Sequence, residues 1–390
     1  MSAALAGQSG RGVVTYTEPR GTLRTWGRQP WPLHPRRELR HSVERSGDTS
    51  VGKMFEPRQG VTPGGEGVLD LLQLPPDRAV ELGLERELVH PAAKGLELQA
   101  GAAKPAATVQ LYPYIVTDDG GRRAFDVEQP GDDPWDALDP EPRGAAETRL
   151  VAGLQERERH RRLVERRIAQ GVCPYPVTAE YLLDRYDVLA PRRPKDKPMS
   201  SFGRRWWEYL WPRDPAAMLA VPKLIGPRLT RWERFALDEH GLLPTDSCVT
   251  LSAPSSAVGR GLLARVRDAL GHHLGRPAST RDVLIYVMAF LNANPAAAAL
   301  RIGRLPTPKG SWTVDEDYLA SVRIAVPGDK ALVCEIWTRS HHLVTRTSQG
   351  DTAHDEREQL EALIGRALGF DAALQRELAA WAGPERPSEP

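Results

Sequence analysis

The chain has 390 residues, and apolar residues make up 41% of them, which suffices for one large domain or for two to three ordinary ones. Its net charge is only +1, which excludes a protein that binds nucleic acid through bulk basicity; any such surface must come from local clustering of charge. The 34 glycines and 34 prolines predict many loops and short elements.

The first 150 residues predict a tail followed by a folded lobe. Residues 1–40 are rich in Gly, Arg and Pro with little periodicity, so we expect a partly disordered tail, and they lack the apolar core of a signal peptide. Residues 41–150 predict an N-terminal α/β lobe that includes an acidic loop. Its expected elements are a strand, a loop and a strand over 52–72, a short helix followed by a turn over 77–90, a strand over 108–117 and the acidic loop over 118–147.

Residues 151–200 predict a charged helix and a basic linker. The helical pattern covers 146–170 and carries many arginines and glutamates with only a thin apolar stripe. This pattern is typical of a solvated helix face, and a helix that follows the DNA backbone is the alternative.

The rest of the chain predicts helices and strands without a regular βαβ rhythm. Residues 201–330 predict the main core, and residues 331–390 predict a C-terminal strand and helices. The expected elements are helices over 259–274 and 280–293, the second capped by Ser279 or Thr280, strands over 319–327 and 329–337, and a helical stretch over 353–381 that breaks near Gly369 and restarts at Asp371. These elements predict an α+β fold with mixed sheets and a helical C-terminal part.

Signatures of catalysis and of membrane insertion are missing from the sequence. There is no Gly-rich phosphate loop, no HExxH and no GxSxG. Adenine methyltransferases hold a flipped base with a Pro-rich loop that ends in an aromatic residue, and neither LPPD at 74–77 nor NPAA at 294–297 has that residue. The three cysteines form no CxxC pair, and the longest apolar run, 283–291, is about half a membrane span. We expect a soluble, cytoplasmic protein with no cofactor or metal and no catalysis by the chain alone.

The densest mixture of basic and aromatic residues lies between residues 190 and 235. Arginine can pair with phosphate or with two acceptors of guanine, and tryptophan or tyrosine can stack on exposed bases. The segment 222–238 can run extended, and alternate side chains would then face DNA or pack inward. The DNA-facing set would be Lys223, Arg228 or Arg234, and the inward set Leu224, Leu229 and Phe235. A core role for the tryptophans, with the arginines as ordinary surface, is equally compatible with this pattern.

The order of motifs in this stretch resembles a known family. Trp211-Pro212-Arg213 and Pro222-Lys223-Leu224 are similar to the W-x-R and P-K-I segments of the TaqI-like C-terminal specificity domain. That domain belongs to type II and type IIG restriction-modification methyltransferases and to the large methyltransferases of BREX and related phage-defence systems. Phe235, Asp238 and Gly241 fit the last three fixed positions of its R-x-x-F-x-x-D-x-x-G hairpin.

The N-terminal half carries further motifs in the family's order. The segment 60–72 (GVTPGGEGVLDLL) resembles G-I-x-T-G-x-x-x-x-F, and 84–99 (LERELVHPAAKGLELQ) resembles E-x-L-x-P-x-x-K-G-x-D-I. The YPY strand of the family has its counterpart at 110–114 (QLYPY). The resemblance therefore spans residues 40–330.

The chain departs from the family at several positions. Trp232 occupies the arginine position of the hairpin, and Arg231 comes one residue early. The TG turn has become Thr62-Pro63-Gly64, the L-N-S turn is Leu291-Asn292-Ala293, and residues 331–390 have no clear counterpart. The upstream methyltransferase domain is also absent from the sequence.

The resemblance implies a two-lobed target-recognition domain for duplex DNA. We expect it to give sequence specificity to an adenine-specific DNA methyltransferase of a restriction-modification or phage-defence system, with the methyltransferase as a separate partner chain. Lysines and arginines would position the duplex on its phosphates, and a few side chains would read base edges. The candidate DNA-binding residues are Thr62, Lys94, Tyr112, Lys197, Arg204, Arg205, Trp207, Tyr209, Arg213, Lys223, Arg228, Arg231 and Arg234.

Two other functions remain open on the sequence alone. An unrecognised nuclease or a degenerate methyltransferase is one, since Asp329 and Glu335 resemble a nuclease-like acidic pair, although Trp337 stands where that pattern requires a lysine. A protein-interaction scaffold of a defence complex is the other, with the aromatic stretch as its interface. A magnesium-dependent cleavage assay and DNA binding at low salt separate the three.

Overall fold

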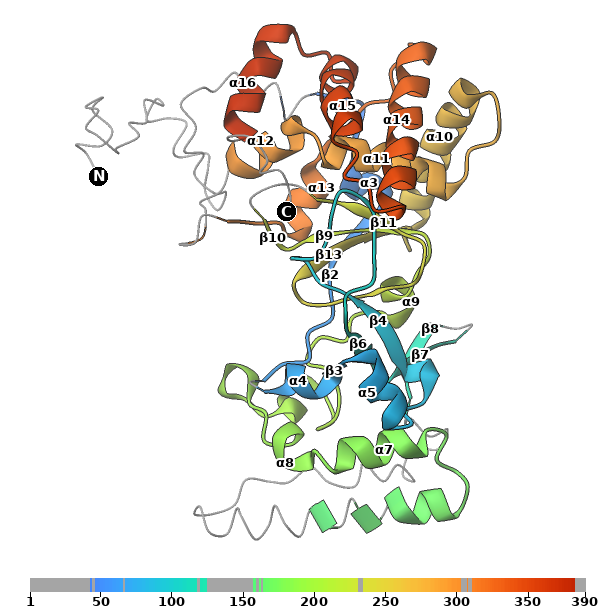
Figure 1. The fold of residues 1–390 in the computed structure, drawn as a ribbon, viewed down its shortest axis with the longest axis vertical. Helices are drawn as coiled ribbons and strands as arrows, with labels where there is room; N and C mark the ends of the chain where they lie inside the picture. Colours follow the sequence, from blue (N-terminus) through green and yellow to red (C-terminus); the bar gives the residue numbers. More distant parts are fainter. Residues whose placement is uncertain are drawn as a thin grey trace, which may run out of the picture.

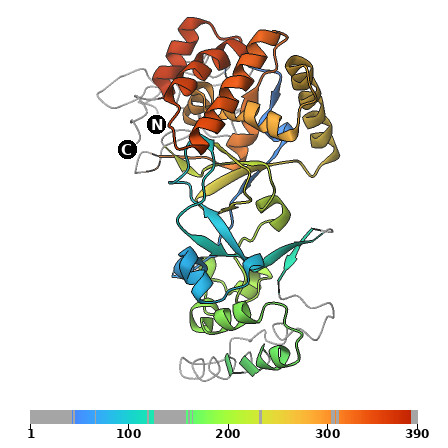
Figure 2. The same cartoon turned by 45° about the vertical axis from the view of Figure 1, so that its right-hand side comes forward.

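The computed structural model describes residues 43, 46–65, 67–117, 120–124, 157–158, 161–162, 164–230, 234–302, 307 and 311–382. The predicted tail, most of the acidic loop and Arg231 lie outside these residues, and the helix predicted over 146–170 is described only in part. Within them the fold is mixed α+β with a helical C-terminal part, as predicted. The C-terminal helices occupy one end of an elongated molecule, and the sheets lie in its middle. The helices α7 (Pro176–Leu183) and α8 (Tyr186–Leu189) lie at the other end (Figures 1 and 2).

A five-stranded sheet lies beneath the C-terminal helices. Its strands, in spatial order, are β2 (Glu56–Gln59), β13 (Cys248–Ser252), β9 (Lys223–Pro227), β11 (Ala236–Asp238) and β5 (Gly101–Ala102). All five residues of β9 are buried because the strand is central and both of its faces are covered. Leu224 belongs to the core beneath the helices, and Ile225 belongs to a small cluster on the opposite face. The predicted alternation of solvent-facing and inward residues in this strand is therefore wrong.

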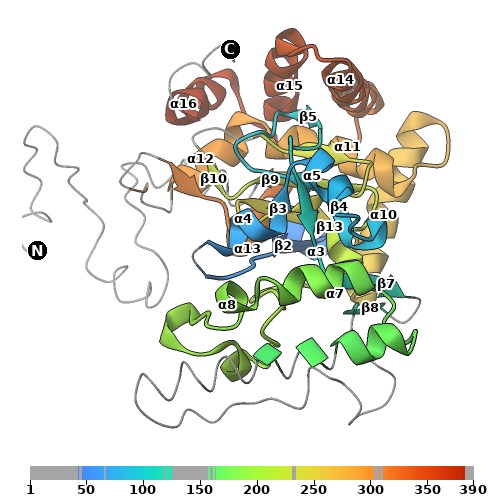
Figure 3. The same cartoon turned by 60° about the horizontal axis from the view of Figure 1, so that its bottom comes forward.

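A second sheet and its own core form the middle and lower part of the molecule. Its strands, in spatial order, are β12 (Leu243–Pro244), β4 (Val89–Ala93), β6 (Val109–Leu111) and β3 (Gln73–Leu74). The helices of this part are α4 (Val68–Leu72), α5 (Pro76–Glu81), α7 (Pro176–Leu183), α8 (Tyr186–Leu189) and α9 (Pro215–Met218), and β7 (Tyr114–Thr117) pairs with β8 (Gly120–Arg123). Figure 3 brings this end forward and shows α7 and α8 following one another along it.

The C-terminal helices pack around α11 (Thr280–Leu291), whose residues from Asp282 to Leu291 are all buried. They are α10 (Ala257–Leu274), α11 (Thr280–Leu291), α12 (Asn294–Ile302), α13 (Glu316–Ser321), α14 (Lys330–Ser348), α15 (His354–Ala367) and α16 (Ala372–Ala382), with α3 (Val51–Met54) packed against α10 and α13. Ser279 and Asp282 form a capping box at the start of α11. No single described helix combines the length and the apolar composition of a membrane span; α11 and α12 reach both only together, across a bend of 59°.

Two short strand pairs and two isolated bridges complete the connections among the described residues. The pairs are β1 (Thr49–Ser50) with β15 (Arg323–Ile324) and β10 (Leu229–Thr230) with β14 (Trp312–Thr313), and the bridges join Val61 with Thr245 and Thr62 with Trp211. The helix break near Gly369 is confirmed, since Gly369 has a positive φ of 76° and Asp371 accepts a hydrogen bond from the backbone of Leu374.

The strand predicted over 329–337 is wrong. These residues begin α14, and Asp329 caps the helix by accepting a hydrogen bond from the Leu332 backbone. Val333, Ile336, Leu343 and Val344 are buried at helical spacing, so the β-branched run follows a helical period rather than a period of two. The strand predicted over 319–327 is reduced to β15, because α13 occupies its first half.

Candidate nucleic-acid interface

Basic side chains from distant segments gather at one end of the five-stranded sheet. At this end β2 finishes at Gln59, β9 finishes at Pro227 and β13 begins at Cys248. Arg58 and Arg228 both lie near enough to Arg213 for their charges to lower its pKa. Lys94 follows β4, and the neighbouring Gly95 bonds to Ser247 at the same sheet end. We call Arg58, Gln59, Lys94, Arg213 and Arg228 the basic edge.

The turn at Thr245–Ser247 holds the basic edge together. The Gln59 side chain donates to the Asp246 carbonyl (3.5 Å), and the Arg228 backbone N–H donates to the Ser247 carbonyl (2.7 Å). The N–H of Gly95 donates to the Ser247 hydroxyl (3.0 Å). A Cβ at Gly95 would lie 2.2 Å from the Ser247 carbonyl oxygen, so only glycine permits this approach. This turn thus positions Gln59 and Gly95, both of which lie more than 150 positions from it in the sequence.

Arg213 is the most constrained member of the basic edge. Its φ of +63° lies in the left-handed region, which costs an L-residue roughly 1–2 kcal/mol. Burial lowers the pKa of its guanidinium, Glu316 opposes this shift, and Arg228 and Arg58 lower the pKa further. The guanidinium donates to the Gln59 side-chain oxygen (3.1 Å), and its buried Nε has no partner among the described residues.

Few carboxylates face these cations. Arg58 pairs with Glu56 at 2.5 Å, and the Glu316 side chain accepts from the backbone N–H of Gln59 at 3.0 Å. Within the part of the chain that the structure describes, no acidic side chain pairs with Lys94 or Arg228. These two cations therefore retain hydrogen-bond capacity for an external anion.

An exposed aromatic ring borders the basic edge. Trp211 is 36% exposed and forms an antiparallel bridge with Thr62, two residues before Arg213. The ring of Phe202 meets Trp211 edge-to-face at 6.0 Å and supports it from one side. The buried Thr62 hydroxyl has no partner among the described residues.

Four predicted DNA contacts are wrong, because the side chains are buried. Tyr112, Trp207 and Tyr209 lie in the core of the lower part, and Lys223 lies between the two sheets. The Tyr209 hydroxyl donates to the Leu111 carbonyl (2.8 Å), and that of Tyr112 donates to the Pro212 carbonyl (2.6 Å). These aromatic residues stabilise the lobe that presents the surface and do not belong to the surface itself.

Lys223 forms a fully buried ion pair instead of a phosphate contact. Its ammonium lies 2.6 Å from the Asp238 carboxylate and donates to the Ala220 carbonyl (3.0 Å). Burial lowers its pKa, and the charge of Asp238 opposes that shift. The Asp238 carboxylate also accepts from the backbone N–H groups of His240 and Leu242, so the pair organises the hairpin that follows β11.

The other candidates divide between the basic edge and the lower part. Arg234 precedes β11, and the pairing of Ala236 with Ile225 places it beside the end of β9. Lys197 is exposed, but it lies in the lower part. Arg204 approaches the buried Glu208 at 3.8 Å, and the same carboxylate accepts from the backbone N–H of Arg205. The structure thus gathers part of the predicted set: Thr62, Lys94, Arg213, Arg228 and Arg234.

The candidate residues chosen from the sequence did not include Arg58 and Gln59, and they omitted Trp211 although the W-x-R motif contains it. Arg58 and Gln59 reach the basic edge through the pairing of β2 with β13, which joins segments about 190 residues apart. No local pattern reveals such a pairing. Their position directly before the G-V-T motif was the available signal.

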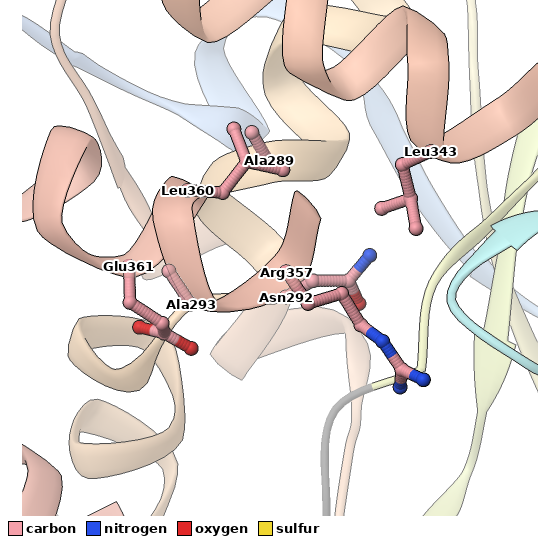
Figure 4. A pocket seen from close by; sticks show the side chains of 7 residues that line it. All are labelled: Ala289, Asn292, Ala293, Leu343, Arg357, Leu360 and Glu361. Atoms are coloured by element: carbon pink, nitrogen blue, oxygen red, sulfur yellow. The ribbon is translucent and has the colours of Figure 1, made fainter. Parts of the chain in front are cut away.

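A pocket elsewhere in the molecule is unsuited to a cofactor. Its enclosed volume is about 10 Å³, and it is lined by Ala289, Asn292, Ala293, Leu343, Arg357, Leu360 and Glu361 (Figure 4). Ligand pockets usually exceed about 300 Å³. The Asn292 side chain already bonds the N–H and carbonyl of Phe235, which is a structural role. Among the described residues, no three His, Cys, Asp or Glu side chains gather as metal ligands.

Comparisons with known proteins give a distant likeness. No protein-family model and no curated protein matches the chain. The type IIL restriction-modification enzyme MmeI in complex with DNA aligns over 86% of this chain with 10% identity and a TM-score of 0.42. The type IIG restriction endonuclease BpuSI aligns over 94% with 11% identity and a TM-score of 0.37. The matched parts cover 37% and 38% of those two chains, so this chain spans less than two fifths of their length.

Proposed function

We propose that the chain binds duplex DNA at the basic edge and reads its sequence. In this proposal it is the target-recognition part of an adenine-specific DNA methyltransferase of a restriction-modification or phage-defence system, and a separate chain supplies catalysis. The observation that carries the proposal is Arg213, whose strained backbone holds its guanidinium near the charges of two other arginines, Arg58 and Arg228. Strain of this kind concentrates at functional sites.

The charge arrangement favours a polyanion as the ligand. Guanidinium groups that repel one another are stabilised when phosphates lie between them, and the chain as a whole, at +1, has no general excess of positive charge. Lys94 and Arg228 suit phosphate contacts, because no described carboxylate occupies them. Arg213 and Gln59 suit base edges, since guanidinium pairs with guanine and a carboxamide with adenine.

The positions of the family-like motifs support the methyltransferase context. Thr62-Pro63-Gly64, Lys94-Gly95 and Trp211-Pro212-Arg213 come from three separate motifs of the TaqI-like specificity domain. All three border the basic edge through the bridge of Thr62 with Trp211, the bond of Gly95 to Ser247 and the bond of Arg213 to Gln59. Motifs that share an order in sequence and a place in space fit one binding surface.

The test removes the basic edge and measures duplex binding by fluorescence anisotropy. The triple variant Lys94→Ala, Arg213→Asn, Arg228→Ala should weaken binding more than about a hundredfold, because each of these side chains should contribute roughly 1–3 kcal/mol to binding. The slope of log K against log salt should decrease by roughly 0.9 for each phosphate that the variant no longer neutralises.

The matched control removes three exposed arginines of the C-terminal helices, Arg265, Arg366 and Arg376, by substitution to alanine. This variant has the same change in net charge and should bind DNA nearly as well as the unmodified chain. Equal binding by both triple variants contradicts the proposal. A cleavage product with magnesium, or heat on titration with the methyl donor, contradicts the division of labour between this chain and a catalytic partner.

A further inference from the structure

Two exposed leucines border the basic edge. Leu96 is 83% exposed and follows Lys94-Gly95; Leu229 is 51% exposed and follows Arg228. The two segments meet at Ser247, which accepts from the N–H of Gly95 through its hydroxyl and from that of Arg228 through its carbonyl. Each segment thus presents one cation and one apolar side chain at the same sheet end.

Leu96 is mounted on a rigid support. The N–H of Glu97 donates to the Lys94 carbonyl (3.0 Å) and closes a tight turn with Leu96 near its tip. Gly95 is fixed against Ser247, and Leu98 is buried in the cluster between the two sheets. A leucine held in water between two anchored neighbours keeps its apolar surface hydrated, and contact with an apolar ligand group would bury that surface.

A thymine methyl group is the apolar feature that duplex DNA offers at the level of the bases. In the major groove each thymine presents its C5-methyl beside hydrogen-bonding atoms, whereas phosphates and sugars line the groove edges. Cations that engage phosphates on either side would hold the tip of the turn over the base edges. The tip of one leucine side chain can contact a single methyl group, and Leu229 is exposed at the same sheet end.

We propose that Leu96 packs against the C5-methyl group of a pyrimidine in the major groove, so that the recognised site contains a thymine at a fixed position. This inference rests on the DNA binding proposed above. 5-Methylcytosine presents the same methyl group, and the experiment distinguishes thymine from 5-methylcytosine as its source.

The experiment begins with selection of bound duplexes from a random pool by the full chain, which defines the recognised site. Each thymine of that site is then replaced by uracil, which removes only the methyl group, and affinities are measured for the unmodified chain, Leu96→Ala and Val80→Ala. Val80, on α5, is 80% exposed and serves as the matched control. Because both side chains are exposed, neither substitution should change thermal unfolding.

One thymine should be sensitive to the swap. Uracil at that position should weaken binding by the unmodified chain and by Val80→Ala about fourfold, the effect of one buried methyl group, while Leu96→Ala should bind both duplexes equally. Chains that contain Leu96 should bind a duplex with a 5-methylcytosine–guanine pair at that position more tightly than one with a cytosine–guanine pair. They should bind the thymine duplex most tightly of the three if thymine is the natural source of the methyl group.

Two results overturn the inference. If no uracil swap distinguishes Leu96→Ala from the unmodified chain while specific binding persists, Leu96 does not read a methyl group. If 2-aminopurine fluorescence rises on binding and the rise requires Leu96, without any methyl dependence, the leucine is a wedge between bases. A chain that selects no duplex at all contradicts the proposed function itself, which is a separate outcome.

Discussion

Arg213 combines backbone strain, partial burial and two like-charged neighbours in one residue. None of these features stabilises the folded chain. We therefore expect a substitution of Arg213 to weaken DNA binding without lowering the free energy of unfolding. Arg213→Asn should leave the free energy of unfolding unchanged or raise it by about 1 kcal/mol, because asparagine tolerates the left-handed region. The same variant should bind duplex DNA at least about fivefold more weakly, since an arginine that touches a base or a phosphate contributes roughly 1–3 kcal/mol.

Urea unfolding and fluorescence anisotropy together check this expectation. Arg193→Asn is the control, since Arg193 is an exposed arginine outside the basic edge. A marked loss of stability in Arg213→Asn would assign Arg213 a structural role and remove the main support for the binding surface.

The sequence predicted DNA contacts for both Arg213 and Lys223, which belong to family-like motifs, but Arg213 lies at the basic edge and Lys223 is buried. A motif specifies residue types and spacing, whereas burial depends on what covers a strand. The segment over 93–103 helps to cover the face of β9 to which Lys223 belongs, and this segment lies more than 100 positions away in the sequence. Arg58 was missed for the same reason, because the pairing of β2 with β13 is long-range.

At the scale of elements, Arg192 joins three segments of the lower part. Its buried guanidinium donates to the carbonyls of Leu189, Pro63, Gly64, Trp206 and Glu208. Burial lowers its pKa to about 10, so it remains charged at neutral pH. The guanidinium thus ties the end of α8 to the turn at Thr62-Pro63-Gly64 and to the segment before Trp211.

Arg192→Lys should lower the free energy of unfolding by about 3 kcal/mol or more, because one ammonium cannot replace a planar group that satisfies several buried carbonyls. The folded fraction should also bind DNA more weakly, since the Thr62 turn borders the basic edge. Denaturant unfolding measures the first effect, and Arg185→Lys, at a half-buried arginine of the same part, is the comparison. Equal stabilities would show that the carbonyls do not depend on the guanidinium.

Local signals predicted the helices better than the strands. The amphipathic period and the Ser279 cap identify α10 and α11, and Gly369 with Asp371 identifies the break between α15 and α16. The segment over 329–337 shows the limit of such signals, since β-branched residues in a short apolar run fit a strand or a buried helix equally well. Contacts of α14 with α11 and α15 decide the outcome, and no local pattern contains them.

At the scale of the whole molecule, the two sheets meet at a pair of groups that repel when both are charged. His90 of β4 is half-buried, and burial together with the charge of Lys223 in β9 lowers its pKa from 6.5 to about 4. The folded chain therefore keeps His90 neutral between these two pH values, while the unfolded chain binds the proton.

The contribution of neutral His90 to the free energy of unfolding is fully present above pH 6.5. It falls by up to about 3 kcal/mol as the pH falls towards 4. His90→Phe should remove this part of the acid sensitivity and keep the ring that meets Tyr112 edge-to-face at 6.1 Å. Urea unfolding at pH 7.5, 6, 5 and 4 measures the difference between the two chains. Parallel pH profiles would mean that His90 is protonated equally in the folded and unfolded states.

Ser247 holds the turn over Lys94–Glu97, which carries Leu96, and the backbone of Arg228 through two different atoms. Its hydroxyl, a side-chain group, holds Gly95, and its carbonyl, a backbone group, holds Arg228. Substitution of Ser247 can remove the hydrogen bond of its hydroxyl to Gly95. The hydrogen bond of its carbonyl to Arg228 is available with any residue at this position, because every residue has a backbone carbonyl. If the turn reads a base as proposed, substitution of Ser247 should therefore change the base preference while the proposed contact of Arg228 with a phosphate is kept.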